Sequence, residues 1–242
     1  MNRSNNSNLE RLEVLSEDSP FAFSEAFNSL RTNFNFAALN GEYKKIVVTS
    51  TLQQEGKTSV AINLAISLAS AGSKVLLIDC DMRNPSIHRR LRVKRPPNTG
   101  LSSVLGGEST LENSLFKTSR GITVLLGGTI PPNPVEMLSS KAMSDMLDVL
   151  SQHYDYIICD APPVGLVTDA AVLSTICDGA LFIIKQKGAK KKQVHNAINR
   201  LKAVNANILG IVFSQYDIKE DATKSYGYYR NYKNCYYDYG DK

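Results

Sequence analysis

The stretch TSTLQQEGKTS, from Thr49 to Ser59, decides the fold of this chain. It departs from the phosphate-loop pattern G-x-x-x-x-G-K-[ST] at Thr51, which stands where the first glycine is expected. A strongly apolar run, 44–50, precedes it, and a helical run, 57–71, follows and ends at Gly72. Backbone N–H groups between a buried strand and a helix converge on an anion, so we predict a phosphate loop despite Thr51.

The second half of the loop carries the residue types that phosphate binding needs. Gly56 allows close approach of the backbone, Lys57 supplies a mobile cation, and the Thr58 hydroxyl is a ligand for Mg²⁺. The alternative is an ordinary strand–loop–helix turn with a chance Gly-Lys-Thr. The predicted phosphate-binding residues are Gln53, Gln54, Glu55, Gly56, Lys57, Thr58 and Ser59.

The rest of the chain alternates short β-branched runs with helical ones. The strand runs are nearly all apolar, which is typical of strands buried on both faces of a parallel sheet. We therefore predict an α/β fold, a P-loop NTPase-like, mostly parallel sheet with helices on both faces. Strands are predicted at 44–50, 74–79, 122–127, 154–160, 179–185 and 207–214, and helices at 20–38, 57–71, 139–152, 169–176 and 190–204.

Three carboxylates follow or end predicted strands. Asp79 and Asp81 lie in LLIDCDMRNP, and Asp160 lies in IICDAPP. In open parallel sheets, ligands bind beyond the carboxyl ends of the strands, so these side chains and the phosphate loop are expected to share one crevice. Carboxylates bind Mg²⁺, and one of the pair could instead accept a hydroxyl proton. The alternative for each is a helix cap.

The composition favours a globular protein that works in a reducing compartment. The 242 residues carry a net charge of +5, and the runs 83–95 and 185–202 contain basic residues but no acidic ones. Such runs are either solvated helix faces or surfaces for anionic partners. The four cysteines form no C-x-x-C, no signal peptide is apparent, and the apolar stretch 60–72 is too short to span a bilayer.

The C-terminal sequence, YGYYRNYKNCYYDYGDK, differs in composition from everything before it. It lacks branched aliphatic residues, so we predict a mobile tail at 221–242, after a mobile segment at 1–19 and a P-loop domain at 20–220 that includes the N-terminal helix. The tail is either a built-in phosphoacceptor or a sticky aromatic segment that stacks on single-stranded nucleic acid. The candidate acceptors are Tyr226, Tyr228, Tyr229, Tyr232, Tyr236, Tyr237 and Tyr239.

The ordered boxes STLQQEGKT, LLIDCDMRNP and IICDAPP, together with the tyrosine tail, resemble the bacterial tyrosine kinases, the P-loop autokinases of capsule and exopolysaccharide biosynthesis. The resemblance implies ATP and Mg²⁺ as cofactors and phosphorylation of the tail in trans. It also implies catalytic roles for Lys57, Asp79, Asp81 and Asp160, with Thr58, Asp79 and Asp160 around the metal. Arg83 belongs to the second box, with a local electrostatic role.

The same resemblance implies partners and a location. We expect a cytoplasmic protein, recruited to the inner face of the membrane by a transmembrane activator of the chain-length-regulator type. A cognate tyrosine phosphatase and a homo-oligomer, possibly a ring, are also expected, and nucleic acid is not. The family pattern E-x-x-R-x-x-R appears here as Glu25, Asn28 and Arg31, so Glu25 and Arg31 are the predicted subunit contacts. Ser214 replaces the asparagine that meets the base in related ATPases.

Two other functions compete with the kinase. A partitioning or septum-site ATPase would carry a lysine at position 52, where this chain has leucine, and would lack the tyrosine tail. A nucleotide-gated scaffold would bind ATP without transferring phosphate, and its tail would recruit partners.

Overall fold

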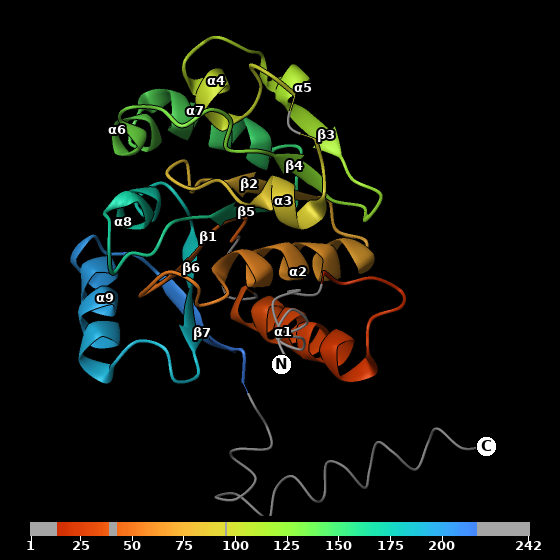
Figure 1. Ribbon diagram of the computed structural model, residues 1–242, viewed down its shortest axis with the longest axis vertical. Coiled ribbons are helices and arrows are strands. Elements are labelled where there is room, and N and C mark those ends of the chain that lie inside the picture. The colour runs from red at the N-terminus through yellow and green to blue at the C-terminus, as the bar shows by residue number, and fades with distance from the viewer. Residues whose placement is uncertain (1–13, 39–42, 95, 217–242) are drawn as a thin grey trace, which may run out of the picture.

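A seven-stranded sheet forms the centre of the protein (Figure 1), as seen in a computed structural model that describes residues 14–38, 43–94 and 96–216. Every pair of neighbouring strands is parallel except β3 with β4 at one edge. Across the sheet the strands are β3 (Leu115–Lys117), β4 (Thr123–Leu125), β2 (Val75–Asp79), β5 (Tyr156–Asp160), β1 (Lys45–Ser50), β6 (Gly179–Lys185) and β7 (Ile208–Ser214).

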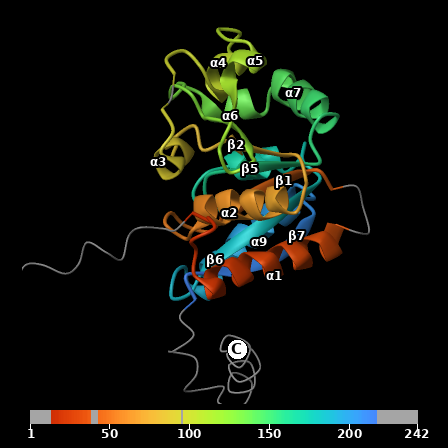
Figure 2. The same cartoon turned by 90° about the vertical axis from the view of Figure 1, so that its right-hand side faces the viewer.

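Helices cover both faces of this sheet, so each face has its own apolar core. The first core is completed by α1 (Phe21–Ala38), α2 (Lys57–Ser70) and α3 (Ile87–Leu91), with α1 beside α2 and in contact with β7 (Figure 2). The second is completed by α4 (Leu101–Leu105), α5 (Leu111–Ser114), α6 (Pro134–Leu138), α7 (Lys141–Ser151), α8 (Asp169–Leu173) and α9 (Lys191–Ala203). The predicted fold class is confirmed.

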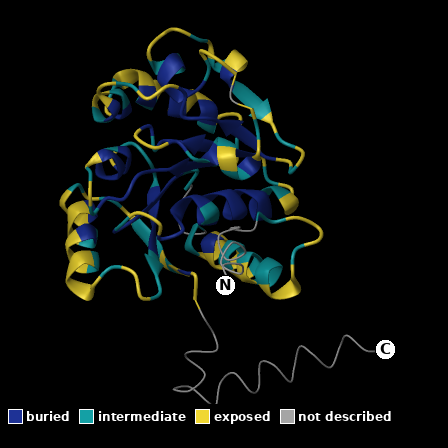
Figure 3. Ribbon diagram, viewed as in Figure 1, coloured by how far each residue is buried: buried dark blue, intermediate teal, exposed yellow. Residues whose placement is uncertain are grey.

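Helix α2 is buried on nearly every side (Figure 3), because it packs on the sheet, has α1 alongside it and is contacted by the segment at Leu15. Its sequence is accordingly apolar almost all round rather than amphipathic. Helix α1 presents Phe34 to the core, and the Arg31 guanidinium donates from Nη1 to the carbonyl and hydroxyl oxygens of Ser67 on α2, at 2.8 and 3.1 Å. An arginine thus fastens α1 to its own chain.

The long elements agree with the sequence prediction, and the short ones were missed. All six predicted strands and the five predicted helices form, with 122–127 shortened to β4 and 169–176 shortened to α8. The antiparallel edge strand β3 and the helices α3 to α6 were not predicted. Each of these has three to five residues, too few to show a helical or alternating period in the sequence.

The first described residues pack against the domain. The Leu15 N–H donates to Asn63 Oδ1 on α2 at 2.8 Å, and Val14 and Leu15 contact the α2-side core. Ordered contacts therefore begin before residue 20, where the sequence placed the start of the domain. Residues 1–13 and the tail from 217 lie outside the described residues.

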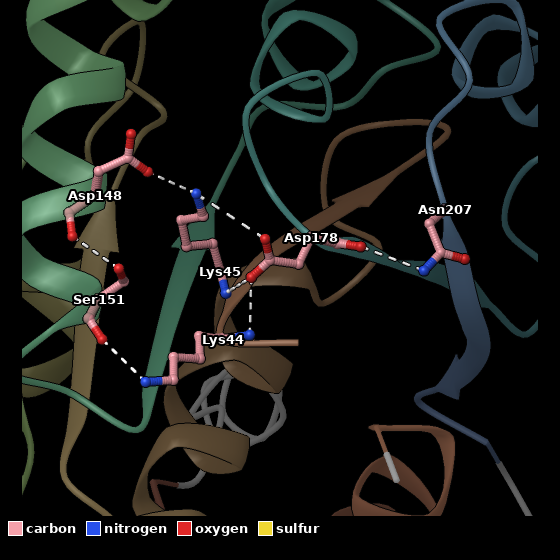
Figure 4. Close-up of polar contacts among 6 residues, drawn as sticks. All are labelled: Lys44, Lys45, Asp148, Ser151, Asp178 and Asn207. Carbon is pink, nitrogen blue, oxygen red and sulfur yellow. Dashed lines mark hydrogen bonds and ion pairs between the residues drawn. The ribbon is translucent and has the colours of Figure 1, made fainter. Parts of the chain in front are cut away.

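The amino-terminal edge of the sheet is held by a polar cluster around Asp178 (Figure 4). Its carboxylate accepts the backbone N–H groups of Lys44 and Lys45 at 2.8 and 2.7 Å. Lys45 Nζ reaches Asp148 on α7 at 2.9 Å, and Asn207 Nδ2 donates to the Asp178 carbonyl. These contacts join β1, α7 and the segments that lead into β6 and β7.

In the described ranges, no helix combines the length and apolarity needed to cross a bilayer. Cys80 and Cys159 are buried, Cys177 is partly buried, and all three are free thiols. Cys80 and Cys159 belong to the core on the α7 side of the sheet.

Candidate active site

The carboxyl ends of β1, β2 and β5 are adjacent and bring the predicted site together. In the sheet register, Asp160 of β5 lies beside Val48 of β1 on one side and Asp79 of β2 on the other. The phosphate loop follows β1 directly, so it emerges between these two aspartates and the end of β6. Residues far apart in the sequence therefore meet at the carboxyl ends of adjacent strands, as the strand pattern predicted.

The loop has the left-handed backbone that an anion-binding turn uses. Gln54 has φ 60° and Gly56 has φ 88°, and α2 begins at the next residue, Lys57. A side chain at position 56 would be strained by this φ and would crowd the Ser214 hydroxyl. Lys57 and Thr58 are largely buried in the first turn of α2, at the positive end of the helix.

Glu55 holds the loop from within. Its side chain is 2 % exposed, and Oε2 accepts the Leu52 N–H at 2.7 Å while Oε1 accepts the Ala189 N–H at 3.2 Å. Its carbonyl accepts the Ser214 hydroxyl. The loop is therefore tied to the segments after β6 and at the end of β7. Ser214, which occupies the base-contacting asparagine position of related ATPases, instead contacts the loop backbone.

The missing first glycine is accommodated by close packing against the segment after β5. Thr51 is 2 % exposed, and a Cβ at Gly165 would overlap its carbonyl oxygen. Thr49 adds two hydrogen bonds to the same segment, donating to the Pro162 carbonyl at 2.8 Å and accepting the Val164 N–H at 3.1 Å. Glycine at position 165, in the segment after β5, leaves the space that the Thr51 backbone and side chain occupy.

Asp79 is fully buried, and one of its two carboxylate oxygens is hydrogen-bonded. Its Oδ2 accepts the backbone N–H groups of Ser86 and Ile87 at 2.9 and 3.1 Å, which caps α3. Its Oδ1 is buried and has no hydrogen-bond partner among the residues that the structure describes. Burial, with the nearby Asp160 carboxylate, raises the pKa of Asp79 to about 8. The helix-cap interpretation thus holds for one oxygen and leaves the other available to a ligand.

Asp160 is the least satisfied polar group of the site. It is fully buried, and within the described part of the chain neither carboxylate oxygen has a hydrogen-bond partner. Burial raises the pKa of Asp160 to about 6, and the neighbouring Lys57 charge and the nearby Thr58 hydroxyl oppose that rise. Buried carboxylates left this way are expected to have a ligand in the working protein.

Asp81 is the partly exposed carboxylate of the three. Its Oδ1 accepts the Asn84 N–H at 3.1 Å, and burial raises its pKa while Lys57 opposes the rise. Two residues on, Arg83 forms a two-pronged ion pair with Asp169 at the start of α8, at 2.9 and 3.0 Å. The sequence analysis assigned Arg83 a local electrostatic role without naming its partner, and it missed Asp169, which carries no motif of its own.

The donors present fit Mg²⁺ bound together with a nucleotide. Unpartnered oxygens of Asp79 and Asp160 and the Thr58 hydroxyl are hard ligands of the kind Mg²⁺ prefers. The described residues contain no cluster of three His, Cys, Asp or Glu side chains suited to a metal. That agrees with P-loop sites, where phosphate oxygens and waters complete the metal's coordination.

A phosphate loop after β1, carboxylates at the ends of β5 and β2, and helices on both faces define a P-loop NTPase. A protein-family profile described as an AAA domain matches residues 43–211.

The chain is also similar to named kinases. It is 38% identical over 210 residues to the tyrosine-protein kinase CpsD of Streptococcus pneumoniae, covering 86% of this chain and 91% of that protein. It is 33% identical over 230 residues to the tyrosine-protein kinase YwqD of Bacillus subtilis (strain 168), covering 95% of both chains. The solved kinase domain of the Escherichia coli tyrosine kinase ETK matches with a TM-score of 0.75 and 32% identity, over 80% of this chain and 77% of that one.

The chain belongs to the family of bacterial tyrosine-protein kinases. This confirms the resemblance seen in the ordered boxes.

Proposed function

We propose that the protein transfers the γ-phosphoryl group of ATP to tyrosines in the C-terminal tail of a second copy, and that this controls capsular or exopolysaccharide synthesis. The observation that carries the proposal is the pair of buried, incompletely bonded carboxylates, Asp79 and Asp160, beside the Lys57–Thr58 turn. Such uncompensated groups are costly in an empty site and suited to a bound metal and triphosphate.

Each residue of the site has a role in this reaction. The loop from Gln53 to Ser59 binds the phosphates through its N–H groups, and Lys57 neutralises charge on them. Thr58, Asp79 and Asp160 hold Mg²⁺, which when bound supplies further charge neutralisation at the transferring phosphoryl group.

Asp81 is the residue suited to accept the tyrosine proton. Asp79 and Asp160 are fully buried, whereas Asp81 is partly exposed and can reach an incoming phenol. The phenolic oxygen forms a bond to the γ-phosphorus, the bond to the β,γ-bridging oxygen breaks, ADP leaves, and the proton passes to the Asp81 carboxylate.

The tail and the partners complete the proposal. Seven tyrosines in the last 17 residues would be presented at high effective concentration to a neighbouring copy in a homo-oligomer, with Glu25 and Arg31 as candidate subunit contacts. A transmembrane activator would recruit the protein from the cytoplasm to the inner membrane face, and a cognate tyrosine phosphatase would reset it. The named relatives support protein-tyrosine phosphorylation as the activity, and the tyrosine-rich tail of this chain supports the tail as its acceptor.

The test is phosphotyrosine mapping by mass spectrometry after incubation with ATP and Mg²⁺, with and without the activator's cytoplasmic segment. Wild type, Lys57→Met, Asp81→Ala and the remote control Asp145→Asn are compared. We expect phosphate on tail tyrosines in wild type and Asp145→Asn only. Bound ATP with no phosphotyrosine under any condition would reject the kinase proposal in favour of a nucleotide-gated scaffold.

Trans transfer is tested by mixing two variants. A Lys57→Met chain with an intact tail is combined with a wild-type catalytic domain whose seven tail tyrosines are phenylalanine. Phosphate on the Lys57→Met chain shows transfer between copies, and its absence shows that transfer, if any, stays within one chain.

A further inference from the structure

An ion pair connects the two loops that carry the site's aspartates. Arg83 lies in the loop between β2 and α3, two residues after Asp81, and Asp169 is the first residue of α8, after the loop that follows Asp160. Arg83 Nε donates to Asp169 Oδ2 at 2.9 Å, and Nη2 donates to Oδ1 at 3.0 Å. This planar, two-bond geometry fixes orientation as well as distance.

The two ends of the bridge differ in burial. The Asp169 side chain is 0 % exposed, whereas that of Arg83 is 41 % exposed. The buried Asp169 carboxylate is held in place by the residues packed around it, and moving away from Arg83 would leave its charge buried and unpaired. Asp169 is therefore the fixed end of the ion pair. Arg83 and the loop that bears it are the part that is held.

Local helix capping does not explain the acid at position 169. Thr168 is the N-cap residue of α8 and makes no side-chain cap hydrogen bond, and both Asp169 oxygens point to Arg83 rather than to backbone N–H groups of the helix. The carboxylate is therefore placed for the contact between loops.

The loop so held is short and carries Asp81. Asn84 N–H donates to the Asp81 carbonyl and carboxylate, and Ser86 N–H donates to Asp79. The segment is thus fixed at Asp79 on one side and at Arg83 in its middle. The Cys80 N–H donates to the Asp160 carbonyl at 2.9 Å and Met82 is buried in the core, so the Arg83 pair adds a side-chain attachment to a segment already held by its backbone and packing.

We propose that Asp169 is a positioning residue for phosphoryl transfer, which holds Arg83 and thereby fixes Asp81 relative to the end of β5. This rests on the proposed function, with Asp81 at the tyrosine hydroxyl. Asp169 touches neither substrate nor nucleotide in this role. Its removal should slow the transfer step and leave ATP binding, which depends on the loop at 53–59, nearly unchanged.

The experiment measures the two steps separately in the full chain. ATP affinity is measured with a fluorescent ATP analogue, and the single-turnover rate of tail phosphorylation is followed by mass spectrometry, well below each variant's unfolding temperature. The variants are Asp169→Asn, Arg83→Lys, Arg83→Gln and the double Arg83→Gln/Asp169→Asn. The matched control is Asp145→Asn, which breaks the exposed Lys141–Asp145 pair on α7.

We expect the transfer rate to fall by about tenfold to a hundredfold in every bridge variant, with the analogue's Kd within about threefold of wild type. Arg83→Lys matters most, because it keeps the charge at a half-exposed site and removes only the two-bond geometry. The double variant should be no slower than the slower single variant, since both changes break one bridge. The control should match wild type.

The proposal is overturned if Arg83→Lys or Asp169→Asn, shown to be folded, transfers phosphate at the wild-type rate. It is also overturned if rate and ATP affinity fall together, which would place the bridge in nucleotide binding. A wild-type chain without kinase activity would instead count against the proposed function itself, so the two failures are distinguishable.

Discussion

At the scale of single residues, the charged form of the buried Asp160 carboxylate is electrostatically unfavourable. The carboxylate is buried, has no hydrogen-bond partner in the described part of the chain, and has its pKa raised by burial to about 6. In the unfolded chain an aspartate titrates near pH 4. The fold therefore favours the protonated form, and the associated stability is full below about pH 4 and lost as pH rises through about 6.

Asp160→Asn should remove this pH-dependent cost while abolishing transfer. In protein freed of metal and nucleotide, the free energy of unfolding of the variant at pH 7.5 should exceed that of wild type by on the order of 2 kcal/mol. The gap should be much smaller near pH 4.5, because most of the carboxylate is then protonated in the folded chain. Differential scanning calorimetry at both pH values measures it, and an equal gap at both would contradict burial of the charged carboxylate as its cause.

A second residue-scale feature is the contact between Gly165 and Thr51. Because a Cβ at position 165 would overlap the Thr51 carbonyl oxygen, Gly165→Ala must displace the phosphate loop. We expect ATP affinity to fall by about tenfold or more, on the scale of about 1–3 kcal/mol for overpacking. Gly210→Ala, where a Cβ meets nothing within 4 Å, is the matched control for titration with a fluorescent ATP analogue.

At the scale of elements, α1 is attached to α2 through Arg31. The guanidinium lies on Ser67 of the same chain, and Ser67 in turn donates to the Phe27 carbonyl at 3.3 Å. The sequence predicted Arg31 as a subunit contact, which stays a prediction. Glu25 is near Asn28 on the same helix, with Nδ2 3.5 Å from its carboxylate.

Arg31→Ala separates these two roles. Loss of the bonds to Ser67 should lower the free energy of unfolding by about 1–2 kcal/mol in chemical denaturation. If α1 also forms a subunit contact through Arg31, sedimentation velocity should show dissociation as well. Asn33→Ala, at an exposed position of α1, controls for the truncation itself. An unfolding midpoint equal to that of Asn33→Ala would contradict the attachment of α1 through Arg31.

At the scale of the whole molecule, the carboxyl ends and the amino ends of the strands serve different functions. The phosphate loop and the aspartates lie at the carboxyl ends of the strands. At the amino ends, Asp178 holds the start of β1 (Figure 4). The sheet places this cluster far along the strands from the site, so stability and catalysis should be separable by mutation.

Asp178→Ala should destabilise the protein without altering the chemistry. It leaves the N–H groups of Lys44 and Lys45 without their acceptor, at a cost of about 2–3 kcal/mol. We expect a lower unfolding temperature. At a temperature where the variant is fully folded, its single-turnover transfer rate should be within about twofold of wild type. A rate that falls while the protein is fully folded would show that the two ends of the strands are coupled.

The sequence by itself determined the fold class, the long elements and the positions of Lys57, Thr58, Asp79, Asp81 and Asp160 at the strand ends. It could do so because strands buried on both faces of a sheet have near-continuous apolar sequences. In addition, the residues of a phosphate loop are separated by fixed numbers of positions. Tertiary structure alone decided how Gly165 makes room for Thr51, why Arg31 meets Ser67, and that Asp169 holds Arg83. Those contacts join segments far apart in the chain, and no local pattern records a partner that only the folded sheet brings near.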